Sequence, residues 1–144
     1  MPPALTPALA LEYVHELSAD VRAGVVLDAA GALLAGSGEL AGDARALLDA
    51  AGGSAELEAG TPDGVVCAVR SADHAAVAVC GRFAIGAVVR QDLRAALAAL
   101  EGRPPAHGPQ AEPAPATTGA GARDERLAAA AERLISALQS RSST

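Results

Sequence analysis

The chain of 144 residues contains no lysine, because all 11 of its basic side chains are arginines. This excludes a phosphate-binding P-loop, whose lysine reaches the phosphates, and a catalytic lysine that forms a Schiff base. Tryptophan is absent too, and the chain has a single Tyr and a single Phe. Pockets for flat cofactors are usually lined by apolar and aromatic side chains. We therefore expect no cofactor.

The sequence also lacks long apolar runs and basic regions. No run reaches the 18 apolar residues of a membrane span, and the first residues lack the basic and apolar segments of a signal peptide. Two cysteines in such a chain are expected to be reduced thiols of a cytoplasmic protein. Residues 1–100 carry 12 acidic and 6 basic side chains, and residues 101–144 carry five of each. Without a basic patch, neither nucleic acid nor an anionic membrane is expected as a partner.

The apolar residues are mainly Ala, Val and Leu, and together the hydrophobic types make up 51% of the chain. Small side chains bury little area each, so the expected core is thin. Association with a second copy is a common remedy for a small core. The composition therefore favours a homodimer.

Prolines mark the organisation of the chain. Five of the nine lie at positions 104, 105, 109, 113 and 115. Such a composition buries too little apolar surface to offset the entropy of ordering the backbone. We expect a globular domain over 4–102, a disordered linker over 103–122 and an amphipathic helix over 123–140.

Three helices are predicted in the domain. The first follows the N-cap Thr6, with an apolar face that repeats every four residues. The second covers 39–51 and ends before two glycines. The third covers 85–100. The apolar face of the first comprises Leu9, Tyr13, Leu17 and Val21, and that of the third comprises Ile85, Val89, Leu93, Leu97 and Leu100.

Five strands are predicted between these helices, over 23–28, 32–35, 55–59, 65–70 and 75–80. The last two form a tight hairpin that is apolar on both faces, which requires cover on both sides of the sheet. The predicted fold class is therefore α/β, with an α+β layered arrangement. A five-stranded, mainly antiparallel sheet lies between helices in the order α-β-β-α-β-β-β-α.

This order and four of its stretches resemble the roadblock (dynein light-chain) family, especially the bacterial members associated with small GTPases. The stretches are Ala23–Asp28, Gly64–Ser71, His74–Gly81 and Asp92–Leu97. The resemblance covers about residues 5–100, and its motifs are strand and turn patterns without a catalytic signature. It implies a longin-like or profilin-like fold.

The resemblance also implies a function. Members of the family form dimers in which the middle helices pack together and the third strand extends the sheet. The chain would then be a non-enzymatic signalling scaffold that binds or modulates a small Ras-like GTPase or a sensor kinase. The implied dimer interface consists of Leu40, Ala44, Leu47, Leu48, Ala51, Glu56, Leu57 and Glu58.

A different function is suggested by the turn Gly36–Ala41, which fits the glycine pattern of a dinucleotide site and has Glu56 twenty residues further on. Such a turn places a pyrophosphate at a helix N-terminus. The pattern belongs to a parallel βαβ unit, whereas the neighbouring strands here are predicted to form antiparallel hairpins. A small-ligand or nucleotide sensor is therefore the alternative hypothesis.

Cys67, His74 and Cys80 share one hairpin and raise the possibility of a metal site. The predicted register places Cys67 opposite Ala78, so Cys67 and His74 lie about 13 Å apart along the strands. Ligands of one zinc ion each lie about 2 Å from the metal, so these two residues are too far apart to share it. Two buried thiols are the preferred interpretation. Ser71 beside His74 is interpreted as a capped hairpin end, because a catalytic triad also needs an orienting acid and an oxyanion hole. No catalytic or metal-binding residue is predicted.

The predicted C-terminal helix has an apolar stripe. Its charges are placed favourably for the helix dipole, with acidic residues at its start and Arg141 at its end. Either it docks on the domain or frays, or it is a tethered ligand for a groove on a partner or forms a short two-stranded seam with another helix. The residues predicted to bind a partner are Arg82, Leu127, Leu134, Ile135 and Leu138.

Overall fold

A computed structural model describes residues 6–52, 54–102 and 121–142. Residues 103–120, most of the predicted linker, lie outside the described part of the chain, and residues 121 and 122 already belong to the last helix. The elements are α1 (Pro7–Leu17), β1 (Val21–Asp28), β2 (Leu33–Gly36), α2 (Gly38–Ala51), β3 (Glu56–Thr61), β4 (Gly64–Arg70), β5 (His74–Cys80), α3 (Gly86–Leu100) and α4 (Gly121–Ser142).

The five strands form one antiparallel sheet in the order β2-β1-β5-β4-β3. The predicted fold class and element order are confirmed. In the β4–β5 hairpin, Cys67 lies opposite Ala78, which is the predicted register. β2 and β3 are the two edges of the sheet, so each has one side of its backbone without a neighbouring strand among the described residues.

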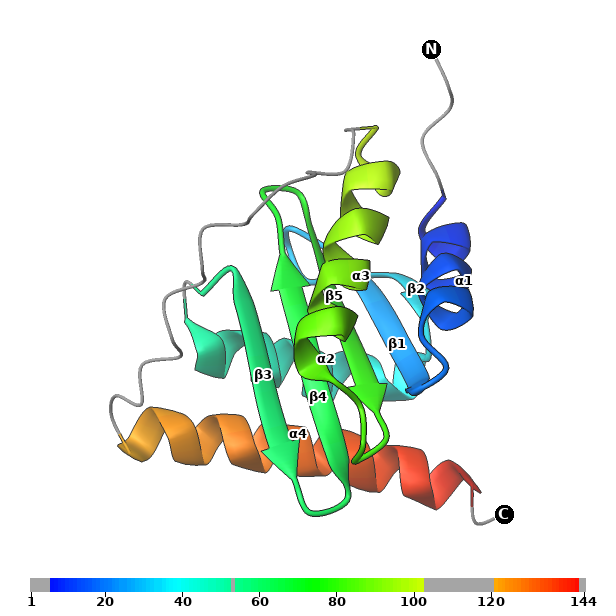
Figure 1. Ribbon diagram of the computed structural model, residues 1–144. Coiled ribbons are helices and arrows are strands. Elements are labelled where there is room, and N and C mark those ends of the chain that lie inside the picture. Colours follow the sequence, from blue (N-terminus) through cyan, green and yellow to red (C-terminus); the bar gives the residue numbers. More distant parts are fainter. Residues whose placement is uncertain (1–5, 53, 103–120, 143–144) are drawn as a thin grey trace.

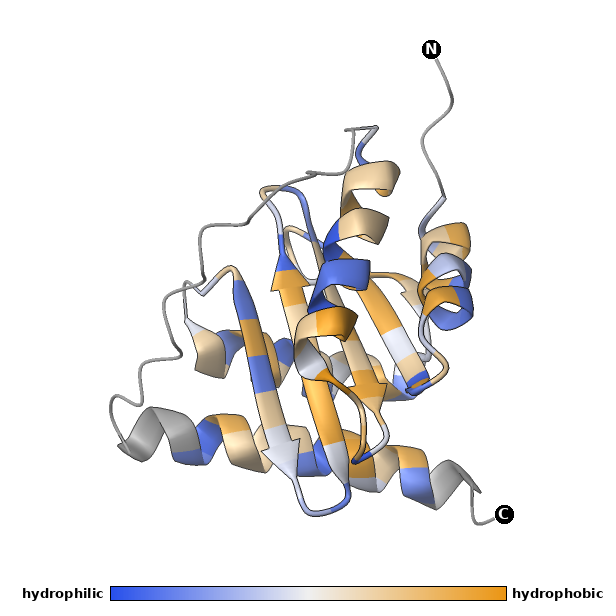
Figure 2. Ribbon diagram, in the orientation of Figure 1, coloured by the Kyte–Doolittle hydropathy of each residue, from blue (hydrophilic) through white to orange (hydrophobic). Residues whose placement is uncertain are grey.

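Helices cover both faces of the sheet, giving three layers (Figure 1). α1 and α3 lie side by side over one face, and α2 and α4 lie over the other. The central strands are the most apolar part of the molecule (Figure 2), because each contributes side chains to both faces. The predicted need for cover on both faces is therefore met by two pairs of helices.

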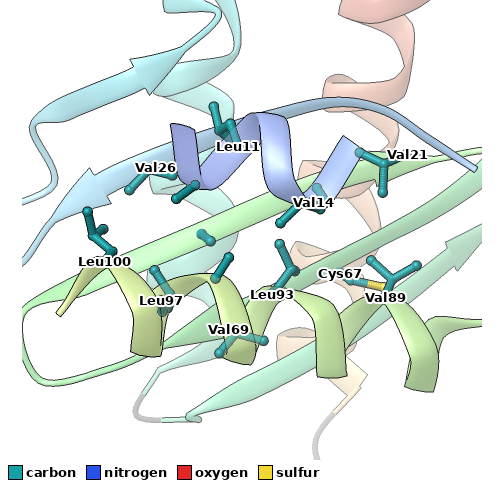
Figure 3. Packing of buried hydrophobic residues seen from close by; sticks show 14 of the residues in the cluster. Leu11, Val14, Val21, Val26, Cys67, Val69, Val89, Leu93, Leu97 and Leu100 are labelled. Atoms are coloured by element: carbon teal, nitrogen blue, oxygen red, sulfur yellow. The ribbon is translucent and has the colours of Figure 1, made fainter. Parts of the chain in front are cut away.

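The core under α1 and α3 is built from aliphatic side chains of both helices (Figure 3). Leu93 and Leu97 of α3 and Val14 of α1 are buried against one side of β1, β4 and β5. Cys67 and Cys80 project into the same layer. The odd-numbered residues of β4 therefore face α3, as the strand period of two requires.

The core under α2 and α4 takes the opposite sides of the same strands. Val66 and Ala68 of β4 face this layer, together with Val77 and Val79 of β5. α4 contributes two buried side chains in each of two successive turns, and α2 contributes three. These residues are Ala130, Ala131, Leu134 and Ile135 of α4, and Leu40, Ala44 and Leu47 of α2.

The predicted apolar face of α1 is wrong, and that of α3 is wrong at one residue, Ile85. In α1 the buried residues are Ala10, Leu11 and Val14, whereas Leu9, Tyr13 and Leu17 are 50, 40 and 48% exposed. The helix carries apolar residues on both sides, so the recurrence of apolar residues every four positions does not determine which side packs on the sheet. Ile85 precedes α3, where it is the N-cap residue with an extended backbone and is 65% exposed. The buried stripe of α3 therefore begins at Val89.

Within the described ranges, no helix is long and apolar enough to cross a membrane.

Candidate protein-binding surface

The loop between β5 and α3 exposes large apolar side chains. Phe83, the only Phe of the chain, is 82% exposed, and Ile85 and Val88 follow it at 65 and 48%. The guanidinium of Arg82 lies over the Phe83 ring, 5.0 Å from its centroid. At an exposed site such a cation–π contact contributes about 0.5–1 kcal/mol. The loop therefore presents an aromatic and arginine pair to solvent, and both residue types are enriched in protein interfaces.

A groove of about 960 Å³ lies beside this loop. Four separate parts of the chain form it: the start of β1 with the turn before it, the β3–β4 turn, the end of β5 with its loop, and the C-terminal half of α4. Its walls combine apolar and charged groups. The lining residues are Asp20, Arg22, Asp63, Val79, Cys80, Gly81, Arg82, Phe83, Ile135, Leu138 and Gln139. We call this the Phe83 groove.

Two arginines of the groove, Arg22 and Arg82, make no ion pair within the described ranges. Both are exposed. Arg22 lies against the loop, because a Cβ added at Gly81 would meet its Nε at 3.3 Å. Asp20 and Asp63, also exposed, make no ion pair within the described part of the chain either. The groove thus carries two cations and two anions that are open to solvent.

The remaining arginines of the domain are engaged elsewhere. Arg45 donates to the Gly31 carbonyl at 2.9 Å. Arg70 donates through Nη2 to Leu48 O and through Nη1 to Gly52 O, both at 2.8 Å. These two carbonyls belong to the C-terminal end of α2, so Arg70 ties that helix to β4.

Arg90 and Arg94 of α3 are paired with the edge strand β3. Arg94 Nη1 donates to Glu56 Oε1 at 2.6 Å, and Arg90 Nη2 lies 3.5 Å from Glu58 Oε1. Glu56 and Glu58 therefore face α3, and Leu57 between them packs on the α2 and α4 side. These three residues were predicted to lie in a dimer interface. The structure places both carboxylates in contacts within one chain.

The other residues of the predicted dimer interface lie on α2. Four of them, Leu40, Ala44, Leu47 and Ala51, are buried within one chain, and Leu48 is half-buried. α4 packs along α2 and against β3 and β4, so it covers the surface on which a second α2 would lie (Figure 1). The C-terminal helix docks on the domain, which decides among the alternatives left open by the sequence.

The structure brings three of the five predicted partner-binding residues together. Arg82, Ile135 and Leu138 line the Phe83 groove. Leu134 is fully buried in the core, and Leu127 is half-buried against it. Sequence reasoning missed Phe83 as a site residue. A lone Phe between Arg82 and a helix start was the available signal, but a lone Phe is usually buried.

The turn Gly36–Ala41 has a structural explanation. Gly36 has a φ of 104°, and a Cβ there would lie 2.2 Å from the Gly24 carbonyl oxygen on β1. This glycine is therefore required for the close approach of two antiparallel strands. β2, which precedes α2, is antiparallel to β1, so the parallel βαβ unit of a dinucleotide site does not occur at this turn.

Cys67 and Cys80 are buried free thiols. A hydrogen bond between the two sulfurs, together with burial, raises the pKa of Cys67 well above its ordinary value, and the same bond lowers the pKa of Cys80. Among the described residues, no group of three or more His, Cys, Asp or Glu side chains is arranged to hold a metal ion.

Ser71 and His74 form a capped hairpin end. Ser71 Oγ accepts from His74 N at 3.2 Å, and Ser71 N donates to His74 O at 2.8 Å. Both side chains also contact Glu101 at the end of α3: His74 Nδ1 lies 2.7 Å from its Oε2, and the Ser71 hydroxyl donates to the same oxygen. Glu101 thus joins the hairpin tip to α3, a role that was not predicted from the sequence.

Comparison with known proteins finds no family model that matches this chain, and no curated protein that is significantly similar to it.

Proposed function

We propose that the chain is a non-enzymatic, protein-binding signalling scaffold that pairs with itself and binds a small Ras-like GTPase or a sensor kinase. The proposal has two parts. Protein binding rests on the surface of the molecule, and the class of partner rests on the resemblance to the roadblock family.

The observation that carries protein binding is the exposure of Phe83. A chain with a single Phe and a core of small aliphatic residues would gain most by burying that ring, since an aromatic side chain buries about 150–250 Å². The ring is instead 82% exposed, under Arg82 and followed by Ile85 and Val88. Exposed apolar groups of this kind mark interaction sites on soluble proteins, and aromatic and arginine residues are the usual anchors of such sites.

The class of partner follows from the family resemblance, which the order of elements supports. The α-β-β-α-β-β-β-α order and the layered sheet are those that the resemblance implies. The third strand is open on its outer side. Ala55 O accepts a hydrogen bond from Arg70 N of β4 at 2.7 Å. In an antiparallel pair, every second residue bonds to the partner strand and the residues between them point their N–H and C=O groups outward. The backbone N–H and C=O groups of Glu58 and Gly60 therefore point away from β4. This edge is available for pairing with another strand.

α4 limits how the implied dimer could form. Because it covers α2, a pair built on the middle helices would have to displace it, whereas pairing through the outer edge of β3 would not. The function is therefore best tested on the full chain and not on the domain alone, since removing α4 would expose the apolar layer above β4 and β5.

The test is affinity capture from native lysate with the tagged full chain, in parallel with GTP and with GDP, followed by mass spectrometry. A small GTPase retained in one nucleotide state, or a sensor kinase retained in both, is the expected result. Recovery of the chain alone, with neither class of partner, would contradict the scaffold proposal.

The nucleotide-sensor hypothesis has a separate test. A ligand that binds only the native state raises its stability. We expect the melting temperature of the purified chain to be unchanged by saturating GTP, ATP or NAD, and a rise with any of them would favour the sensor over the scaffold.

A further inference from the structure

The Phe83 groove and the exposed Phe83 ring lie side by side. The ring is one of the groups that line the groove, and the lining also includes the apolar side chains of Val79 of β5 and of Ile135 and Leu138 of α4. A projecting aromatic side chain thus stands beside a hollow of about 960 Å³, more than an aromatic side chain needs. A two-fold pair needs this arrangement, because each copy must present both the projection and the recess.

The charges of the groove are also self-complementary. Arg22 and Arg82 are balanced by Asp20 and Asp63, and none of the four makes an ion pair with a described residue. The whole chain has a net charge of −6, so this neutral patch differs from the average surface. An acidic ligand would meet both aspartates, and a basic ligand would meet both arginines. A patch with equal numbers of each sign is best complemented by a copy of itself.

We propose that a second copy of this chain docks at the Phe83 groove in a two-fold arrangement. Phe83 of each copy enters the groove of the other, and the arginines of one copy face the aspartates of the other. The interface differs from the α2 and β3 surface that the family resemblance implies. It rests on the self-pairing part of the proposed function and assigns that pairing to another surface.

This interface depends on the C-terminal helix. Ile135 and Leu138 form one wall of the groove, so the recess is complete only while α4 is docked on the domain. The interface also leaves the outer edge of β3 unused, because none of its lining residues belongs to that strand; Asp63 lies in the turn after it.

The test reverses the charges of the groove in two full-length variants. An acidic variant (Arg22→Glu with Arg82→Glu) has four negative groove charges, and a basic variant (Asp20→Arg with Asp63→Arg) has four positive ones. Sedimentation equilibrium at tens of micromolar measures the mass. Wild type is expected at twice the 14.1 kDa of one chain, each variant alone at the mass of one chain, and their equimolar mixture at twice that mass.

Restoration in the mixture separates loss of the interface from loss of folding, because a misfolded variant is not rescued by its counterpart. Glu58→Pro serves as the comparison for the other surface. The N–H of Glu58 points away from β4, so proline there blocks strand pairing at the outer edge and leaves the sheet intact. The proposal predicts that Glu58→Pro keeps the wild-type mass.

Three outcomes would overturn the inference. A dimer that survives both charge variants and is lost with Glu58→Pro would assign the pairing to β3, and the proposed scaffold would stand without this interface. Variants that lose the dimer and do not regain it when mixed would refute the two-fold pairing of charges. A wild type with the mass of one chain would refute self-pairing at either surface, while capture of a GTPase or kinase would still support the scaffold.

Discussion

The docking of α4 predicts the effect of removing one of its side chains. Leu134 is fully buried between α2 and the sheet, in one cluster with Ala130, Ala131 and Ile135 of its own helix. Replacing a buried Leu by Ala costs about 2–5 kcal/mol, from the lost burial and the cavity that remains. Leu134→Ala should therefore weaken the docking of α4 by at least about 2 kcal/mol.

Hydrogen exchange of backbone amides measures this change locally. If α4 opens as a unit, a loss of about 2 kcal/mol lowers the protection factors of its amides by about thirtyfold, since each 1.4 kcal/mol is a factor of ten. The amides of β4 and β5 should keep most of their protection, because α1 and α3 still cover the other face of the sheet. Loss of the groove wall should also weaken association at the Phe83 groove.

Glu132→Ala is the matched control, because Glu132 lies on the same helix and is exposed. Surface substitutions usually change stability by less than about 0.5 kcal/mol, so α4 should exchange as in the wild type. Equal protection of α4 in Leu134→Ala and Glu132→Ala would refute the docking described above. An equal loss of protection over all five strands would instead show that α4 opens only with the whole domain.

Further predictions concern single positions. Arg70→Ala removes both hydrogen bonds to the end of α2 and should lower the free energy of unfolding by about 2 kcal/mol in urea titrations; a value within error of wild type would contradict the tie between α2 and β4. Gly36→Ala should destabilise the protein by at least about 2 kcal/mol, because its backbone has positive φ and faces the neighbouring strand. Gly42→Ala, in the exposed middle of α2 with no atom within 4 Å of the added Cβ, should instead stabilise it by up to about 1 kcal/mol. Cys67 and Cys80 should react with a thiol reagent only after unfolding, since both are buried; prompt labelling of the native protein would contradict this.

Much of the fold could be predicted because strands carry a simple signal. In β4 and β5 nearly every residue is apolar, and the period of two assigns Cys67 to one face and Val66 to the other without further information. The turns at Pro62-Asp63 and Ala72-Asp73 then set the register of the hairpins. This is why the pairing of Cys67 with Ala78 was predicted correctly.

The helices were harder to place, because their faces are decided by packing. α1 has large apolar residues on one side and Ala10, Leu11 and Val14 on the other, and the smaller side packs against the sheet and α3. The position of α4 depends in the same way on small residues. Ala130 and Ala131 are buried in the same cluster as Ala44 of α2, a packing that becomes visible only in three dimensions.

The candidate site was predictable only in part. Arg82 could be identified by its place before the last helix, but the groove around it is formed by four parts of the chain that are distant in sequence. The exposure of Phe83 could not be inferred, since burial is the usual fate of a single Phe in an apolar sequence. Charge balance within the groove likewise depends on which turns the fold brings together.

The most direct test of protein binding through Phe83 compares two tagged baits, wild type and Phe83→Ala, in quantitative capture from native lysate. Tyr13→Ala, which changes the other aromatic residue on the exposed side of α1, is the control. Because Phe83 is 82% exposed in a single chain, the substitution should leave the unfolding transition in urea unchanged at concentrations at which the wild type is a monomer. Its removal as an interface anchor should reduce the recovery of co-purifying copies, and of the proteins that bind the pair, by at least about tenfold. Equal recovery with all three baits would contradict the assignment of protein binding to this surface.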